Sequence, residues 1–512
     1  MRVPRPAIAG RIWFLIAVGI VFFATAAMAQ TTKPVSIRVD WNQILLPLKT
    51  SSTLQVVVNP LLRRGSPIHD KAFRSLTDVG ADYVRYVPWL PYPKLAVAEL
   101  QPPAAGHTFW DFSLIDPMTE DFFSATKGHS VILNFSTIPA WMFQTAKPVS
   151  YPENPDTVDW NYTQGTELRD PSMRELGDYY ARLVSWYTRG GFTDELGQRH
   201  ESGHHYKINY WEVFNEIDNE HHMTAKQYTE RYDAVVAAIH KVDPTIKFVG
   251  LALADISTKP EMFEYFLNHA NHRPGTPLDM ISYHFYAQPT KNQTLDNWQY
   301  TFFDQADRFL ATMRYVEAIR NRLSPETRTT LDEIGTILPT DNTPDDEKGL
   351  IPPAYWNASG AVYAYVFMEA AKLGIDVVGE SQLVGYPSQF PSVSLVDWKT
   401  GSPNARLRVL ELLHQNLLPG YEMVSTKSTA SKNSSKTAVD AQAFLTPTSK
   451  KLLLVNKRNR EVTVSIPKDF DSGLVTTVDV STGAQAPVTT PVGSRLLQLK
   501  AFSVCVVTAP RK

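Results

Sequence analysis

Two glutamates stand at the ends of predicted strands and are candidates to share one catalytic cleft. Glu216 lies near the end of the segment INYWEVFNEID (208–218), and Glu333 lies near the end of TTLDEIG (329–335). Glycoside hydrolysis needs two facing carboxyl groups, because one protonates the leaving oxygen while the other attacks the anomeric carbon or activates water. Proximity and burial push the pKa values of such a pair apart, so that one carboxyl stays protonated while the other is ionised. The pair therefore predicts an O-glycosyl hydrolase.

Four further polar residues follow or end predicted strands and would line the same cleft: Asn215, His284, Tyr286 and Arg85. The Asn215 amide can both donate to and accept from a sugar hydroxyl. Because adjacent strand residues face opposite ways, Asn215 and Glu216 share a cleft only if their strand bends at its end. Arg85 would either hold the nucleophile's carboxylate ionised or form a structural ion pair. His284 is open between a site residue and a core histidine with satisfied hydrogen bonds.

The segment WEVFNEID (211–218) resembles the Trp-Asn-Glu-Pro signature of clan A glycoside hydrolases, with Phe214 in place of the usual Trp and Ile217 in place of the usual Pro. Within that clan the chain is most similar to family 39, which contains β-xylosidases and α-L-iduronidases. The other segments that carry the resemblance are FWDFSLID (109–116), VILNFSTIPAWM (131–142), DMISYHFY (279–286), LDEIGT (331–336) and SLVDWKTGSPNARLRVLELL (394–413).

The resemblance implies a role for most residues of the predicted cleft. It makes Glu216 the general acid/base and Glu333 the nucleophile of a retaining double displacement. Asn215 would contact the 2-hydroxyl of the sugar, and His284, with Tyr286 nearby, would orient the nucleophile. The substrate would be an oligosaccharide or glycoside of plant or microbial origin, and exo-action is implied by the family alone. Neither a metal nor an organic cofactor is expected.

Three other carboxylates lie on these predicted strands. Two of them are alternatives to Glu333 as nucleophile, and the third is a candidate structural residue. Asp332 adjoins Glu333, and strand alternation allows only one of the two to face the barrel interior. Glu380 ends a later predicted strand and is the reserve nucleophile. Glu212 lies deeper on the predicted fourth strand and is expected to be a structural ion-pair partner.

Four tryptophans in predicted loops are candidate sugar-stacking platforms: Trp89, Trp141, Trp356 and Trp398. An indole in such a loop would either stack on a sugar ring or pack at the rim of the barrel. Sugar platforms also suit a second class of protein, a non-catalytic carbohydrate-binding protein on a degenerate barrel. The presence of both strand-end carboxylates argues against that class.

A third class comes from the segment HESGH, which matches the H-E-x-x-H pattern of zinc hydrolases at His200 and His204. Zinc chemistry of that type needs both histidines one turn apart on the same face of a helix. The segment lies in a polar stretch with Gly203 inside it, and a strand is predicted from Ile208 onward. We therefore expect a surface loop here and no metal site.

Alternation of short apolar runs with amphipathic segments predicts how these residues are positioned. Repeated strand–helix units over residues 65–420 indicate a (β/α)8 TIM barrel, an α/β fold with its site at the carboxyl ends of the strands. Residues 421–512 change to short alternating strands, which is typical of a β-sandwich. Residues 30–64 form a strand-rich lead-in that is assigned to the β-sandwich domain. Helices are predicted over Thr224–Val242, Phe302–Leu323, Ala354–Leu373 and Ala405–Leu418.

The first 29 residues have the pattern of a cleavable secretory signal peptide. Three arginines precede an apolar run from Ile12 to Ala27, and the run ends in Ala27-Met28-Ala29. We therefore expect a secreted or periplasmic protein that leaves the membrane after cleavage. The alternative is an uncleaved membrane anchor, for which the apolar run is a little short. Cys505 is the only cysteine, so no intramolecular disulfide can form. Fifty basic and 52 acidic residues are spread along the 512-residue chain, and no basic block indicates a nucleic-acid partner.

Overall fold

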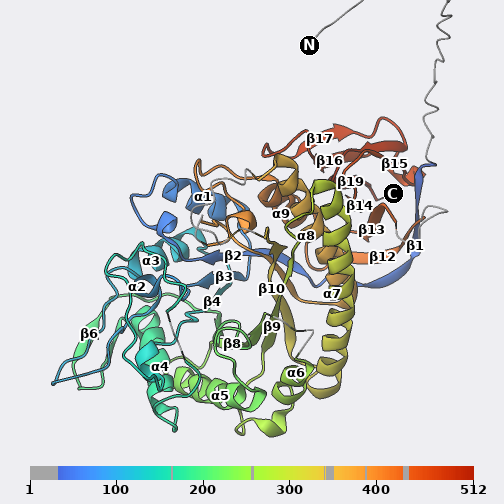
Figure 1. Cartoon of the computed structure of the whole chain (residues 1–512). Coiled ribbons are helices and arrows are strands. Elements are labelled where there is room, and N and C mark those ends of the chain that lie inside the picture. The colour runs from blue at the N-terminus through green and yellow to red at the C-terminus, as the bar shows by residue number, and fades with distance from the viewer. Residues whose placement is uncertain are drawn as a thin grey trace, which may run out of the picture. The chain divides into compact units, whose positions relative to one another are not determined.

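Eight parallel strands close into a barrel in the computed structural model (Figure 1). The structure describes residues 33–162, 165–254, 256, 259–339, 341, 351–386, 389–429 and 437–511, so the predicted signal peptide lies outside the described residues. In order around the barrel the strands are β2 (Ser51–Val57), β3 (Val84–Val87), β4 (Val131–Leu133), β7 (Tyr210–Glu212), β8 (Lys247–Leu253), β9 (Met280–Ala287), β10 (Arg328–Thr336) and β11 (Val377–Glu380). The predicted (β/α)8 fold is confirmed.

The barrel begins earlier than residue 65, the start expected from the sequence. Strand β2 pairs in parallel with β3 and with β11, and so completes the ring. Its residues from Ser52 to Val57 are all buried, as a strand inside a parallel barrel requires. The lead-in is therefore divided, because β1 (Val35–Pro47) pairs with β12 of the C-terminal sheet whereas β2 belongs to the barrel.

Helices lie between the strands and cover the outside of the barrel (Figure 1). They are α1 (His69–Val79), α2 (Pro93–Ala96), α3 (Asp116–Ala125), α4 (Arg174–Thr188), α5 (Ala225–Val242), α6 (Pro260–Phe266), α7 (Leu295–Leu323), α8 (Pro353–Leu373) and α9 (Ala405–Asn416). A capping box at Thr224 begins α5 where the sequence predicted it, and Gly374, with a φ of 76°, ends α8. Helix α7 begins seven residues before the predicted Phe302, at a cap where the Thr294 N–H donates to Asn297.

Three barrel strands lose regular geometry toward their carboxyl ends. After β7 the chain turns through Phe214 and Glu216, with φ of 67° and 39°. In β8, Leu251 and Ala252 have φ of 84° and 45°. Strand β10 has a shift in its register with β9 between Thr330 and Glu333. Such irregularities concentrate where strands must redirect side chains into a site.

The C-terminal strands form one curled nine-stranded sheet with β1. Its members besides β1 are β12 (Glu422–Ser428), β13 (Val439–Leu445), β14 (Ser449–Asn456), β15 (Val462–Ser465), β16 (Leu474–Val478), β17 (Val488–Pro491), β18 (Leu496–Leu499) and β19 (Val504–Pro510). Alternate side chains serve two cores: Leu453 and Val455 of β14 join the barrel's core, whereas Leu452 and Leu454 face a separate core inside the curl. Burial on both faces explains the continuous apolar runs of these strands.

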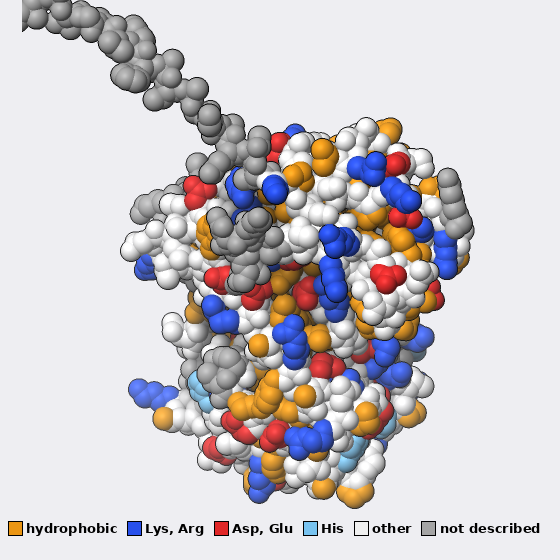
Figure 2. Space-filling model, turned by 90° about the vertical axis from the view of Figure 1, so that its right-hand side faces the viewer, with side chains coloured by type: hydrophobic (Ala, Val, Ile, Leu, Met, Phe, Trp, Pro, Cys, Tyr) orange, Lys and Arg blue, Asp and Glu red, His pale blue; other side chains and the backbone are white. Residues whose placement is uncertain are grey.

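The described surface is mixed in charge and lacks a membrane-spanning element. On the face that Figure 2 shows, basic and acidic side chains are interspersed, in keeping with their nearly equal numbers. Among the described residues, no helix has both the length and the apolar character needed to cross a bilayer.

A two-stranded hairpin, β5 (Gly191–Thr193) with β6 (Arg199–Glu201), projects from the loop between α4 and β7.

Candidate active site

A hollow of about 460 Å³ opens at the carboxyl ends of the barrel strands and contains both predicted glutamates. Glu216 and Glu333 line it, together with Asn215 and Tyr286. The bend after β7 is what brings Asn215 and Glu216, adjacent in sequence, into one cleft. The location matches the face at which barrel enzymes place their sites.

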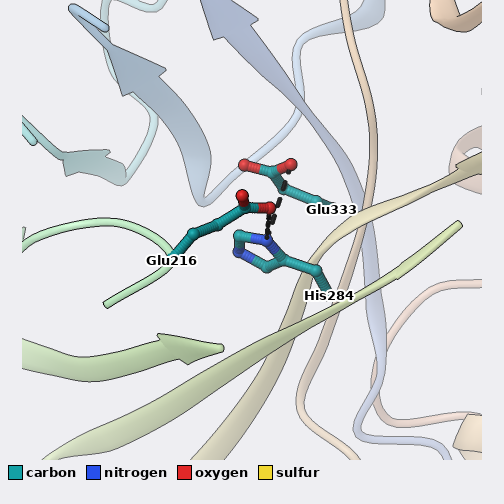
Figure 3. Close-up of side chains that lie close together, drawn as sticks. All are labelled: Glu216, His284 and Glu333. Carbon is teal, nitrogen blue, oxygen red and sulfur yellow. Dashed lines mark hydrogen bonds and ion pairs between the residues drawn. The ribbon is translucent and has the colours of Figure 1, made fainter. Parts of the chain in front are cut away.

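The side chains of Glu216, Glu333 and His284 converge (Figure 3), and the two glutamates of this group line the hollow. Each offers one ligand atom, a ring nitrogen or a carboxylate oxygen, and these three atoms all lie within 4.8 Å of one another. His284 Nδ1 is 3.1 Å from an oxygen of Glu216 and 3.6 Å from an oxygen of Glu333. One imidazole thus faces both carboxyl groups.

Glu333 is held by two strong donors. Arg85 donates through Nη1 to Oε1 at 2.5 Å, and the Tyr286 hydroxyl donates to Oε2 at 2.6 Å. The residue is only 8% exposed, and this burial favours the neutral acid. The charges of His284 and Arg85 and the hydrogen bond from Tyr286 outweigh that burial and lower the pKa of Glu333 below its usual value. The surroundings therefore favour the ionised carboxylate that a nucleophile requires.

His284 is buried yet favours the charged form. Burial lowers its pKa, but the charge of Glu333 and the hydrogen bond with Glu216, the two largest opposing causes, raise it to about 9. Its Nε2 lies 3.5 Å from Asp332. Of the two interpretations that the sequence left open, the structure thus places His284 against the paired carboxyl groups, as a buried cation between them.

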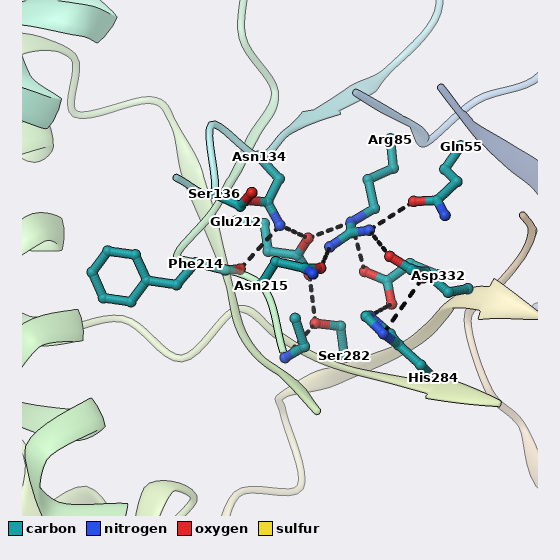
Figure 4. Close-up of polar contacts among 12 residues, drawn as sticks. Gln55, Arg85, Asn134, Ser136, Glu212, Phe214, Asn215, Ser282, His284 and Asp332 are labelled. Carbon is teal, nitrogen blue, oxygen red and sulfur yellow. Dashed lines mark hydrogen bonds and ion pairs between the residues drawn. The ribbon is translucent and has the colours of Figure 1, made fainter. Parts of the chain in front are cut away.

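Beneath the hollow, Arg85 is the centre of a buried polar network (Figure 4). Its Nε donates to Glu212 at 2.5 Å, and its Nη2 donates to the Asn215 side-chain oxygen at 2.6 Å. Glu212 also accepts from Asn134 at 2.6 Å and from Ser282 at 2.5 Å. Both interpretations of Arg85 hold at once, because the same guanidinium contacts the predicted nucleophile and forms a structural ion pair with Glu212.

The expectation that Asp332 faces away from the interior is wrong. Its Oδ2 lies 3.2 Å from Nε of Arg85, so Asp332 and Glu333 both reach the same guanidinium. The register shift in β10 between Thr330 and Glu333 interrupts strict alternation and lets both side chains point inward. Asp332 does not line the hollow, whereas Glu333 does, and burial and the charge of Glu212 raise the pKa of Asp332 well above its usual range.

The reserve nucleophile and three of the four predicted platforms lie away from the hollow, whereas the fourth platform, Trp89, lines it. Glu380 is fully buried and pairs with Arg406 at 2.9 Å. Trp141 is covered by the guanidinium of Arg169, 4.3 Å from its ring, and its Nε1 donates to the backbone of Glu99. Trp398 packs against the barrel's core and does not line the hollow.

The zinc-hydrolase alternative finds no support, because its two histidines serve different carboxylates. His200 lies on strand β6 and contacts Asp194 at 2.9 Å, whereas His204 lies beyond that strand and is 3.4 Å from Asp116. No helix carries the pair. Among the described residues, one group of three potential ligands has its ligand atoms close enough together to hold a metal ion. The group is Glu216, His284 and Glu333. His284 Nδ1 lies within 3.6 Å of an oxygen of each of the two carboxyl groups.

Sequence reasoning missed four residues of the site. Gln55 on β2 accepts from Arg85 Nη1 at 2.7 Å and donates to Ser381 at 2.6 Å. Ser381 is also 2.6 Å from the Tyr286 hydroxyl, and Gln382 lines the hollow. Both follow directly after Glu380, so a search for polar residues past strand ends would have found them. The fourth residue, Glu220, follows Glu216 by one turn.

Comparison with known proteins points to the same enzyme class. Residues 157–308 match a family model described as "Alpha-L-arabinofuranosidase 1 domain", which is under a third of the chain and includes Glu216 and His284. A comparison with curated protein sequences finds no match. Together with the paired glutamates, the family match supports a glycosidase.

Solved structures share the fold at low sequence identity. The family 51 arabinofuranosidase from Xanthomonas axonopodis pv. citri has a TM-score of 0.62 at 12% identity, over 93% of this chain and 100% of that one. An α-L-arabinofuranosidase from Thermotoga maritima, in complex with arabinose, has a TM-score of 0.58 at 13% identity with the same coverage. A family 30 endoxylanase from Clostridium papyrosolvens C71 has a TM-score of 0.54 at 14% identity, again with that coverage. The more specific relationship to family 39 stays a prediction.

Proposed function

We propose that this protein is a retaining glycosidase in which Glu333 is the nucleophile and Glu216 the general acid/base. The observation that carries the proposal is the approach of carboxylate oxygens of Glu216 and Glu333 to within 4.8 Å. Retaining enzymes place their carboxyl groups about 5–5.5 Å apart, whereas inverting enzymes leave about 6.5–9.5 Å for a water molecule. The close approach therefore supports double displacement.

In the first step, an oxygen of Glu333 bonds to the anomeric carbon while the bond from that carbon to the leaving oxygen breaks. Glu216 gives its proton to the leaving oxygen and becomes a carboxylate. In the second step Glu216 takes a proton from water, whose oxygen bonds to the anomeric carbon as the ester to Glu333 breaks. Two inversions give net retention, and both side chains return to their starting protonation states.

The substrate class that we propose is an α-L-arabinofuranoside, with β-D-xylosides as the second candidate. The arabinofuranosidase family model covers the segment with Glu216 and His284, and two of the structures compared above are arabinofuranosidases. The xyloside candidate comes from the resemblance of the sequence motifs to family 39. We also propose exo-action, on that resemblance, and export, on the arginine-led apolar segment that ends in Ala27-Met28-Ala29.

Product stereochemistry tests the mechanism, and a panel of substrates tests the specificity. Purified protein is offered p-nitrophenyl α-L-arabinofuranoside and β-D-xylopyranoside in dilute methanol, and the first methyl glycoside formed is identified by proton NMR. Retention of the anomeric configuration is expected. An inverted first product would refute double displacement, and absence of turnover across a wide panel would favour the non-catalytic carbohydrate-binding alternative.

Analysis of products from an arabino-oligosaccharide distinguishes exo- from endo-action, and N-terminal sequencing of exported protein tests cleavage after Ala29.

A further inference from the structure

A second carboxyl group, Glu220, lies directly behind the predicted acid/base. The turn after β7 places the two on one side, since the Glu220 backbone N–H donates to the Glu216 carbonyl at 2.7 Å. The Glu220 side chain borders a second hollow of about 540 Å³, which shares Glu216, Trp89 and Asn219 with the first. It does not line the first hollow, where Glu333 lies.

One oxygen of Glu220 holds two groups of the site wall. Its Oε1 accepts from the Trp89 indole Nε1 at 2.6 Å and from the Asn215 amide nitrogen at 2.8 Å. The other end of that amide, its oxygen, accepts from Arg85 at 2.6 Å. A flipped Asn215 amide would turn its NH2 group toward a guanidinium and its oxygen toward an acceptor, so these two partners fix its orientation.

The other oxygen, Oε2, is buried and has no hydrogen-bond partner among the described residues. Burial and the charge of Glu216 raise the pKa of Glu220 to about 8, against the opposing hydrogen bonds from Asn215 and Trp89. The charged or titratable groups around it are Glu216, Glu333, Tyr180 and, in the second hollow, Tyr162 and His222. A neutral acid explains the arrangement, because its carbonyl oxygen accepts twice while its hydroxyl adds no negative charge beside Glu216.

We propose that Glu220 is a positioning residue, which fixes the Asn215 amide toward the sugar and the Trp89 indole in the wall through one shared acceptor oxygen. This inference rests on the proposed function, because Asn215 matters only if a sugar binds in the first hollow. Glu220 acts through Asn215 and Trp89 and transfers no proton to or from the substrate.

Two variants separate the acceptor from the charge. Glu220→Gln keeps an acceptor at Oε1, so we expect its kcat to stay within about threefold of wild type, a difference of under about 1 kcal/mol. Glu220→Ala removes the shared acceptor and leaves two buried donors unpaired, so kcat should fall by about 10- to 100-fold with little change in KM. The exposed residue Glu230 supplies the matched control, and Glu230→Gln should behave as wild type.

Azide distinguishes positioning from proton transfer. An external anion such as azide can replace a missing acid/base. Because Glu220 is proposed to be a positioning residue, azide should leave the rate of Glu220→Ala unchanged. Restoration of that rate by azide would overturn the proposal and make Glu220 the acid/base. A wild-type kcat for Glu220→Ala would overturn it as well.

A measurement without substrate keeps the proposal testable if Glu220→Ala does not fold or if the protein hydrolyses nothing in the panel. In proton–nitrogen NMR, the indole resonance of Trp89 is assigned by its loss in Trp89→Phe. We expect that resonance to shift with a midpoint near pH 8 in wild type and to lose this shift in Glu220→Gln. A resonance that titrates equally in both proteins, or in neither, refutes the contact, whatever the outcome of the hydrolysis assays.

Discussion

The two halves of the site differ in how firmly they hold their glutamate. Glu333 lies within the nine-residue strand β10, its side chain is 10% exposed, and Arg85 and Tyr286 donate to its two oxygens. Glu216 lies beyond the three-residue strand β7, its side chain is 16% exposed, and the closest partner of its carboxylate is His284. Two short hydrogen bonds from Arg85 and Tyr286 suit a permanent carboxylate, whereas the contacts of the Glu216 carboxyl are longer, 3.1 Å to His284 and 3.3 Å to Asn219. The contrast in partners thus supports the contrast in proposed roles.

Removal of Glu333 should have the largest effect. Glu333→Ala deletes the atom that attacks the anomeric carbon, so kcat should fall roughly 10⁴-fold or more. Azide bound in the vacated space would attack in its place and give a glycosyl azide of inverted configuration, which proton NMR detects. The control is Glu326→Ala, whose exposed carboxylate precedes β10. A glycosyl azide of retained anomeric configuration would show that Glu333 is not the nucleophile.

Removal of Glu216 should have a smaller effect that depends on the leaving group. Glu216→Ala should lower kcat about 10²- to 10⁴-fold for substrates whose leaving oxygen needs a proton, which is the range for general acid catalysis. A 2,4-dinitrophenyl glycoside needs little protonation, so its first step should be nearly unaffected. Azide should then accelerate breakdown of the ester to Glu333 and give a product of retained configuration. Equal losses for both substrates would show that Glu216 does not act as the acid.

Glu216 and Glu333 could be singled out from the sequence because both follow apolar runs that end in titratable residues, and their separate roles were implied by the resemblance to clan A glycoside hydrolases. The inward orientation of Asp332 could not, since it depends on a register shift that β10 makes against its neighbours. Trp141 looked like a platform because its segment follows a strand, yet Arg169 from a distant loop covers its ring. Side chains in loops are placed by such tertiary contacts, which periodicity does not encode.

The fold was largely predictable for a similar reason, with one instructive exception. Seven barrel strands were predicted from short apolar runs separated by amphipathic helices. The eighth, β2, follows the sheet strand β1 after only three residues, so the two read as one strand-rich segment. Its membership of the barrel rests on parallel pairing with β3 and β11, and the latter is more than 300 residues away. Gln55 was missed with it.

His284 connects the two halves, and its charge should make stability depend on pH. Its pKa is about 9 in the folded protein against 6.5 for an unperturbed histidine, so its contribution is fully present below pH 6.5 and is lost as the pH rises through 9. That gap corresponds to about 3 kcal/mol of the free energy of unfolding. The free energies of unfolding of wild type and His284→Asn, measured with urea, should therefore differ by about this amount less at pH 9.5 than at pH 6. For the exposed control His107→Asn, we expect the same difference from wild type at both pH values. An unchanged difference for His284→Asn would show that His284 is neutral in the folded protein.

The smallest effect expected is that of the Tyr286 hydroxyl, which contacts only the Glu333 side of the site. Tyr286→Phe removes one hydrogen bond to a charged group, worth about 1.5–3 kcal/mol, and so should lower kcat about 10- to 100-fold. Because that bond also helps lower the pKa of Glu333, the acid limb of the kcat/KM profile should move to higher pH. The exposed Tyr300→Phe is the control. An acid limb that stays in place would show that the Tyr286 hydroxyl does not help to hold the Glu333 carboxylate, and that the contrast between the halves is smaller than their contacts indicate.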